Sequence, residues 1–136
     1  EDCLYSNTPS LSRKLEREWT AAFKPFGLTP TQAFLLRMVL ADPGRHQSDL
    51  AKDMNIATAT MSRTLDGLAR LGFVERRASG EDTRGIQIFP TEAALTIAKE
   101  LDSASGKVTK RFKKLFGTGE FDDVVSRLRN ISNALE

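Results

Sequence analysis

Residues 47–91 constrain the fold more than any other part of the chain, because they combine two amphipathic helical patterns with a short extended ribbon. The apolar positions of the two helices are Leu50, Ala51 and Met54, then Met61, Leu65, Leu68 and Leu71. Asn55-Ile56 separates the two sets, and Gly72 is expected to end the second helix as a left-handed cap. Short runs at 73–74 and 86–88 then indicate two strands around the polar loop 78–85.

This order of elements points to nucleic acid. Two short helices joined by a tight turn can place the second helix in the major groove of DNA. A ribbon that follows directly, with Arg84 near its tip, can reach the adjacent minor groove, where a narrow A·T-rich stretch attracts a guanidinium. The pattern therefore indicates a winged helix-turn-helix and predicts sequence-specific binding to double-stranded DNA.

The ordered set of motifs resembles the MarR family of bacterial transcriptional regulators. LTPTQAFLLRMVL at 28–40 resembles the family's second helix, QSDLAKDMN its third, and TATMSRTLDGLARLGFVERR at 58–77 its recognition helix and first wing strand. Glu81-Asp82-Thr83-Arg84 matches the acidic-x-Arg signature of the wing, and FPTEAALTIAKEL resembles the exit into the long fifth helix. The resemblance extends from about Leu11 to the C-terminus. Generic winged helices share most single motifs, so the specific signal is their order.

The expected fold class is mainly α with a small β-wing, in one domain over 1–136. The winged helix-turn-helix lobe that binds DNA is expected at 28–91, between helical segments at 9–26 and 92–136. The first helix is expected to start near Pro9-Ser10 and the second after a Thr29 cap, while Thr91 caps the long fifth helix. The expected apolar stripes are Leu11, Leu15, Trp19, Phe23 and Phe26, then Leu95, Ala98, Leu101, Val108, Phe112 and Leu115, then Phe121, Val124, Val125, Leu128, Ile131 and Leu135.

The terminal helices predict a homodimer. The apolar stripes within 9–26 and 107–135 lie outside a lobe that is too small to cover them, and a second copy of the chain is the simplest partner. The resemblance implies the same, because the first and last helices of the family intertwine in its dimers. Packing within a single chain is the alternative.

Candidate DNA-contacting residues lie on the two short helices and the wing. Ser62 and Arg63 follow Met61 and therefore point away from the core face, toward the groove. The full set is Ser48, Thr58, Thr60, Ser62, Arg63, Arg77, Asp82 and Arg84. Capping is the alternative role for Ser48 and Thr58, and an exposed loop ion pair is the alternative for Asp82 with Arg84.

The resemblance also implies a repressor that binds a palindromic operator and responds to a small aromatic or phenolic effector near the junction of the lobe and the dimer helices. Trp19, Phe23 and Phe26 are candidate walls of that pocket. Packing in the core is the alternative role for each of these three aromatic side chains.

Cys3 and His46 allow more specific hypotheses. Cys3 with Tyr5 resembles the peroxide-sensing branch of the family, in which a first-helix cysteine is oxidised. The chain departs from that branch because Tyr5 is its only tyrosine and the second helix has none. Redox sensing through Cys3 therefore stays an alternative function. His46 is the only histidine, and no metal-ligand spacing surrounds it, so a turn or capping role is expected.

Composition bounds the remaining classes. Residues 45–85 carry seven Lys/Arg and six Asp/Glu, so the lobe is nearly neutral, and a winged-helix interaction module without DNA affinity is a second alternative. No phosphate loop, nucleophile elbow, HExxH or catalytic triad is present in the sequence, so neither an enzyme nor a cofactor is expected. The chain has no membrane-length apolar run and a single cysteine, which favours a cytoplasmic protein.

Overall fold

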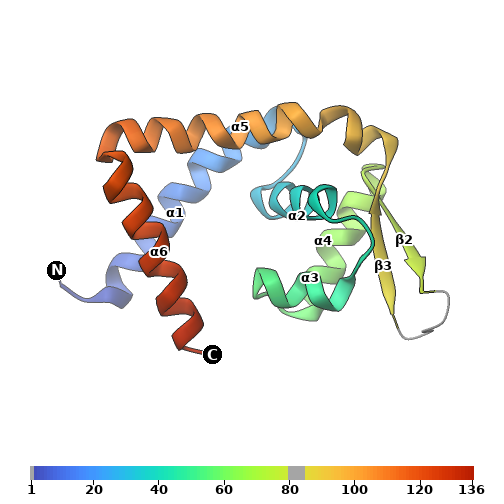
Figure 1. Cartoon of the computed structure of the whole chain (residues 1–136), viewed down its shortest axis with the longest axis horizontal. Coiled ribbons are helices and arrows are strands. Elements are labelled where there is room, and N and C mark those ends of the chain that lie inside the picture. Colours follow the sequence, from blue (N-terminus) through green and yellow to red (C-terminus); the bar gives the residue numbers. More distant parts are fainter. Residues whose placement is uncertain (1, 80–84) are drawn as a thin grey trace.

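The computed structural model describes residues 2–79 and 85–136. Helices and strands alternate in the order α1 (Leu4–Phe23), the 3-10 turn η1 (Lys24–Phe26), α2 (Pro30–Ala41), β1 (Arg45–His46), α3 (Gln47–Met54), α4 (Thr58–Arg70), β2 (Val74–Ala78), β3 (Ile86–Pro90), α5 (Glu92–Phe116) and α6 (Thr118–Ala134). Figure 1 shows α5 running along one side of the molecule, with α2–α4 and the strands below one end and α6 descending from the other. The structure is therefore mainly helical with a small sheet, as expected.

Elements α2–α4 and β1–β3 enclose a common core, and we call residues 28–91 the lobe. This core takes residues from several elements, since Leu36 on α2, Leu65 on α4 and Ile88 on β3 are each 0% exposed. Thr29 begins α2 with a capping box, since its side chain accepts from the Gln32 amide and the Gln32 side chain accepts from the Thr29 amide. Within the lobe, the helix start and the apolar faces expected from the sequence thus agree with the cap and the buried side chains of the structure.

The sheet has three antiparallel strands in the order β1-β3-β2, where the sequence predicted two. Arg45 lies opposite Ile88 and His46 opposite Gln87, so the two residues before α3 form an edge strand. The Gln87 side chain also donates to the Gly44 carbonyl at 3.1 Å. A two-residue strand has no periodicity that a sequence pattern can show, which explains why it was missed.

Helices α1, α5 and α6 form what we call the terminal frame. Trp19 on α1 donates to Ser105 on α5 at 3.2 Å and lies edge-on to the Phe112 ring, with centroids 5.5 Å apart. Arg37 on α2 pairs with Asp102 on α5 at 2.8 Å and ties the lobe to the frame. None of the described helices is long and apolar enough to span a lipid bilayer.

Three boundary and stripe predictions were wrong. Helix α1 begins at Leu4 and contains Pro9, which removes one amide donor from the helix but does not end it. Leu71 follows the last turn of α4 and is 49% exposed. On α5 the buried positions are Ala94, Leu101, Ser105, Val108 and Phe112, while Leu95 and Leu115 are exposed.

Candidate nucleic-acid interface

The core face of α4 determines which of its residues face outward. Met61, Leu65 and Leu68 are 0% exposed and anchor the helix in the lobe. Arg63 lies about 200° around the helix from Met61, since each residue turns about 100°. Its side chain is exposed, and its guanidinium lies 3.4 Å from the Thr60 hydroxyl. The predicted outward position of Arg63 is therefore confirmed.

The other predicted positions on α4 surround its first turns. Thr58 is exposed and is the first helical residue, whereas Ala57 occupies the N-cap position without a side-chain cap bond. The capping role considered for Thr58 is therefore wrong, and its hydroxyl is left at the surface. Thr60 and Ser62 are half-buried on opposite sides of Arg63.

Arg76 fastens the wing to α4. Its guanidinium donates to the Asp66 carboxylate at 2.7 Å and to the Ser62 carbonyl at 2.9 Å. Two bonds from one planar group hold β2 at a defined position beside the helix. Arg76 was not among the candidates from the sequence, because the strand register that turns it toward α4 is not visible in the pattern.

Arg77 lies on the opposite face of β2. It pairs with Glu75 at 3.0 Å and its guanidinium lies 4.1 Å from the centroid of the Phe89 ring. Consecutive residues of a strand face opposite sides, so Arg77 points away from the sheet face that packs on α4. The structure therefore separates Arg77 from Arg63 instead of gathering both on one helix-facing surface.

Ser48 and Thr58 are brought together by the turn between α3 and α4. Both are exposed and line a cavity of about 190 Å³ that also touches Met61, Gly85 and Ile86. The N-termini of α3 and α4 and the first residues of β3 thus meet at one site. Asp82 and Arg84 lie outside the described residues, together with the rest of 80–84.

Comparisons with known proteins identify the family. A model of the MarR family matches residues 26–85. The HTH-type transcriptional repressor YetL of Bacillus subtilis (strain 168) is 34% identical over 110 residues, which cover 78% of this chain and 65% of that repressor. The chain belongs to the MarR family.

Solved MarR-type structures extend this likeness over the whole chain. The structure of the S. aureus MepR–DNA complex matches with a TM-score of 0.89 at 20% identity and covers 100% of both chains. The transcriptional repressor CouR, bound to a 23-mer DNA duplex, matches with a TM-score of 0.84 at 26% identity and covers 96% of this chain and 93% of CouR. The relatives are regulators of transcription, and the family is not one of enzymes.

The aromatic residues predicted to line an effector pocket do not gather around one cavity in this MarR-family chain. Phe23 is 0% exposed and lies edge-on to Phe34, with ring centroids 5.5 Å apart, so its role is core packing. Phe26 borders a groove between α1 and α5, whereas Trp19 borders two cavities beside α6. Of the three, Trp19 is the one that lines a cavity between α1, α2 and α6.

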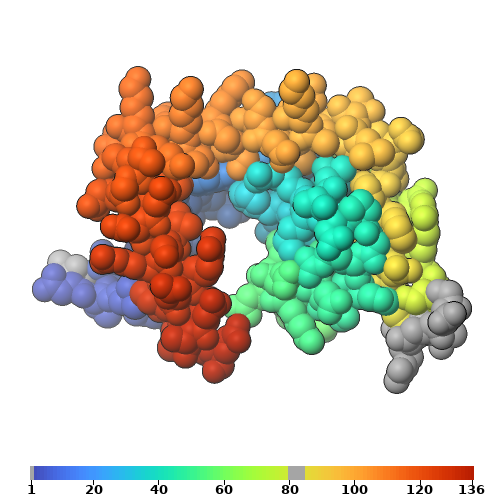
Figure 2. Space-filling model, viewed as in Figure 1, coloured from blue at the N-terminus to red at the C-terminus, as the bar shows by residue number. Residues whose placement is uncertain are grey.

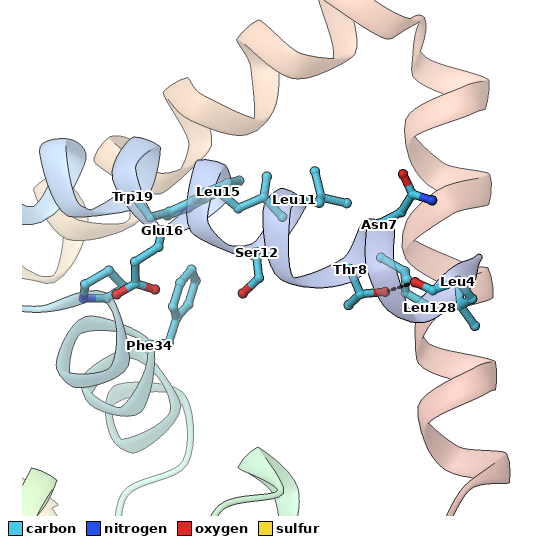
Figure 3. Close-up of a pocket in the computed structure, with 11 residues that line it drawn as sticks. Leu4, Asn7, Thr8, Leu11, Ser12, Leu15, Glu16, Trp19, Phe34 and Leu128 are labelled. Atoms are coloured by element: carbon cyan, nitrogen blue, oxygen red, sulfur yellow. Dashed lines mark hydrogen bonds between the residues drawn. The ribbon is translucent and has the colours of Figure 1, made fainter. Parts of the chain in front are cut away.

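The cavity beside Trp19 has a volume of about 360 Å³. Its walls come from α1, α2 and α6 and are lined by Leu4, Asn7, Thr8, Leu11, Ser12, Leu15, Glu16, Trp19, Pro30, Phe34 and Leu128 (Figure 3). Figure 2 shows the hollow between the α6 side of the frame and the lobe into which this region faces. Most of the wall is apolar, and its polar side chains are those of Asn7, Thr8, Ser12 and Glu16.

Cys3 precedes α1 and is exposed. The pKa of its thiol is lowered, first by the hydrogen bond of the Ser6 backbone, and further by the Ser6 side chain and the Tyr5 backbone. Tyr5 itself is 81% exposed. Among the described residues, no group of three or more metal-ligating side chains could hold an ion, and His46 occupies the N-cap position of α3 without a side-chain cap bond.

Proposed function

We propose that this MarR-family protein is a transcriptional repressor that binds a palindromic site in duplex DNA as a homodimer. In this proposal the first turns of α4 enter the major groove, with Ser62 and Arg63 contacting base edges or phosphates. Ser48, Thr58 and Thr60 contact the backbone around that groove. The observation that carries the proposal is the exposed Arg63 face of a helix whose position is fixed by three fully buried side chains and by Arg76.

The wing completes the proposed contact. Arg84, assisted by Asp82, is proposed to reach the minor groove or the phosphate backbone beside the site read by α4. The stacked position of Arg77 on Phe89 favours a contact with phosphates at the outer side of the wing instead of with base edges. The DNA-bound CouR structure, at 26% identity, supports the use of this fold on duplex DNA.

Dimerisation is supported by the apolar surface that the frame leaves exposed. Helix α6, which the structure describes in full, has no buried residue. Its exposed apolar side chains are Val124, Val125, Leu128 and Ile131, and Leu135 at its C-cap is exposed as well. Two such helices would cover one another in a symmetric pair, and two α4 helices related by a two-fold axis would read a palindrome.

A small aromatic or phenolic effector is proposed to bind the cavity between α1, α2 and α6. An aromatic ring would be enclosed by Trp19, Phe34 and Leu15, and a phenolic hydroxyl could donate to Glu16. Because this cavity joins the frame to the lobe, a ligand that prefers one arrangement would change the spacing of the two α4 helices. We place the protein in the cytoplasm, where its DNA target lies.

The test begins with selection of duplexes from a random-sequence pool by the full chain, followed by affinity measurements at fixed salt. Enrichment of a palindrome, with binding at least a thousandfold tighter than to unrelated duplex, is the expected result. Sedimentation of the complex should give two protein chains for each duplex. Failure to enrich any sequence would overturn the proposal and favour a winged-helix module that binds protein.

A further inference from the structure

Gly85 is the first described residue after position 84, and the side chains around it leave no room for a Cβ atom. The wing stem, defined as residues 74–79 and 85–90, ends here with the Ser79 amide donating to the Gly85 carbonyl at 3.1 Å. A Cβ added to Gly85 would lie 2.5 Å from His46 Cε1, 2.6 Å from His46 Nδ1 and 2.9 Å from Ser79 Oγ. The imidazole of His46 and the Ser79 hydroxyl therefore fill the space above this glycine.

Space, and not backbone conformation, accounts for the glycine. The glycines with a left-handed φ are Gly27, Gly44, Gly72 and Gly117, among those that the structure describes. Gly85 has no such φ, so an L-residue could adopt its backbone angles without strain. The obstacle to a side chain at position 85 is the neighbouring ring of His46.

The strand register explains why this ring lies over Gly85. His46 is paired with Gln87 across the β1–β3 ladder, and Gly85 and Gln87 lie two residues apart on the same face of the chain. A side chain at position 46 can therefore reach diagonally to position 85. A backbone hydrogen bond also holds the chain before β1 against β3, since the Gly44 amide donates to the Ile88 carbonyl at 2.8 Å.

We propose that His46 is a positioning residue for the wing: its ring packs on Gly85 and sets the angle of the wing stem relative to the start of α3. His46 is directly followed by α3, so it connects the helix that supports α4 with the end of the stem nearest the wing tip. The buried Ser79 hydroxyl and Gln47 carboxamide oxygen, on either side of this contact, have no hydrogen-bond partner within 2–79 and 85–136. Packing, and not a polar network, therefore holds the junction.

This proposal rests on the proposed function for its effect on DNA binding. Ser48 and Thr58 border the same 190 Å³ cavity as Gly85 and Ile86. A change in the angle of the stem would therefore change the distance between the surface that meets the major groove and the wing. A protein that must contact two adjacent grooves at once is sensitive to that distance.

The first experiment is independent of DNA and measures amide hydrogen exchange. We expect His46→Ala to speed exchange of the Ser79 amide about tenfold while leaving the amide of Leu65 in the lobe core unchanged. Gly85→Ala should have the same effect, because the added Cβ displaces either the ring or the strand. Unchanged exchange at Ser79 in both variants would overturn the positioning role, whether or not the protein binds DNA.

The second experiment measures affinity for a duplex that the wild-type protein has selected from a random pool. Each single variant should lose about tenfold in affinity, and the double variant His46→Ala/Gly85→Ala should lose no more than Gly85→Ala alone, since removal of the ring relieves the contact. Gly106→Ala on α5 is the matched control, because a Cβ there meets nothing within 4 Å.

The outcomes separate this inference from the proposed function. Additive losses in the double variant, or full affinity in both single variants of a protein that binds DNA, would overturn the role of His46 in binding. If the wild-type protein selects no duplex at all, the proposed function fails, and the exchange of the Ser79 amide alone then decides the positioning of the stem.

Discussion

The lobe and the terminal frame differ in how completely they bury their apolar side chains. Leu65, at the centre of α4, is 0% exposed, whereas Leu128, at the centre of α6, is 44% exposed. Both residues occupy the apolar face of an amphipathic helix. The core of the lobe, which also takes in Phe23, Ala94 and Leu101 from the frame, is therefore complete within one chain, while α6 leaves its apolar side chains exposed. This comparison indicates that burial within one chain stabilises the lobe, whereas the proposed dimer contact depends on the exposed apolar face of α6.

The largest effect is expected from Leu65→Ala, which tests the self-sufficient lobe. Truncation of a fully buried leucine should reduce the free energy of unfolding by about 2–5 kcal/mol. Urea titrations at two protein concentrations would measure the loss. We expect the same loss at both concentrations, since Leu65 is fully buried in the core of a single chain. A loss below about 1 kcal/mol would show that the core of the lobe rearranges to fill the cavity left by the truncated side chain.

Leu128→Glu tests the frame in the same way. A carboxylate in the proposed dimer contact should be costly to bury, so the variant should sediment as a monomer at micromolar concentration and lose at least about tenfold in affinity for the selected duplex. Asn130→Glu is the control, because it introduces the same group at an exposed position about 200° around α6 from Leu128. A dimer that persists in Leu128→Glu would show that α6 does not form the interface.

Arg63→Ala tests the outward face of α4. Loss of a charged contact should weaken binding to the selected duplex by about 1–3 kcal/mol. Arg70→Ala is the matched control, since Arg70 lies on the same face about two turns further along the helix and is also exposed. Titrations of selected and random duplexes at one salt concentration separate base contact from phosphate contact. Equal affinities of Arg63→Ala and wild type would remove α4 as the reading helix.

Arg76→Ala tests whether the clamp between β2 and α4 contributes to stability. The Arg76 side chain is 27% exposed and the Asp66 side chain 52% exposed, so solvent screening limits the expected loss to about 1 kcal/mol in the free energy of unfolding. Arg77→Ala, on the other face of the same strand, should cost less. Thermal melts of the two variants measure the difference. A larger loss for Arg77→Ala would reverse the roles assigned to the two arginines.

The smallest effect concerns Cys3, at the far end of the frame from the lobe. The pKa of its thiol is lowered by hydrogen bonds from Ser6 and Tyr5, so the thiolate should persist to lower pH than in an ordinary cysteine. Alkylation by iodoacetamide, followed against pH by mass spectrometry, should reach half its maximal rate below the usual pH for a thiol. Ser6→Ala should move that midpoint upward. An unchanged midpoint would show that the Ser6 side chain does not affect the thiolate.

Features that depend on neighbours along the chain could be predicted from the sequence. Thr29 and Thr91 cap their helices, and Gly72 adopts φ +82° after α4, because caps and left-handed turns are decided within a few residues. The face of α4 that carries Arg63 followed from helical periodicity alone. The same local signals, taken in order, were sufficient to indicate the winged helix-turn-helix and the family.

Features that depend on contacts between distant segments became visible in the folded chain alone. The register of β2 turns Arg76 toward α4 and Arg77 away from it, and a shift by one residue would exchange them. The strand at 45–46 exists because β3 supplies its hydrogen bonds, and Phe23 became core because Phe34 lies against it. The contact of His46 with Gly85 arises in the same way. Sequence periodicity describes one element at a time, whereas these positions are set by how elements meet.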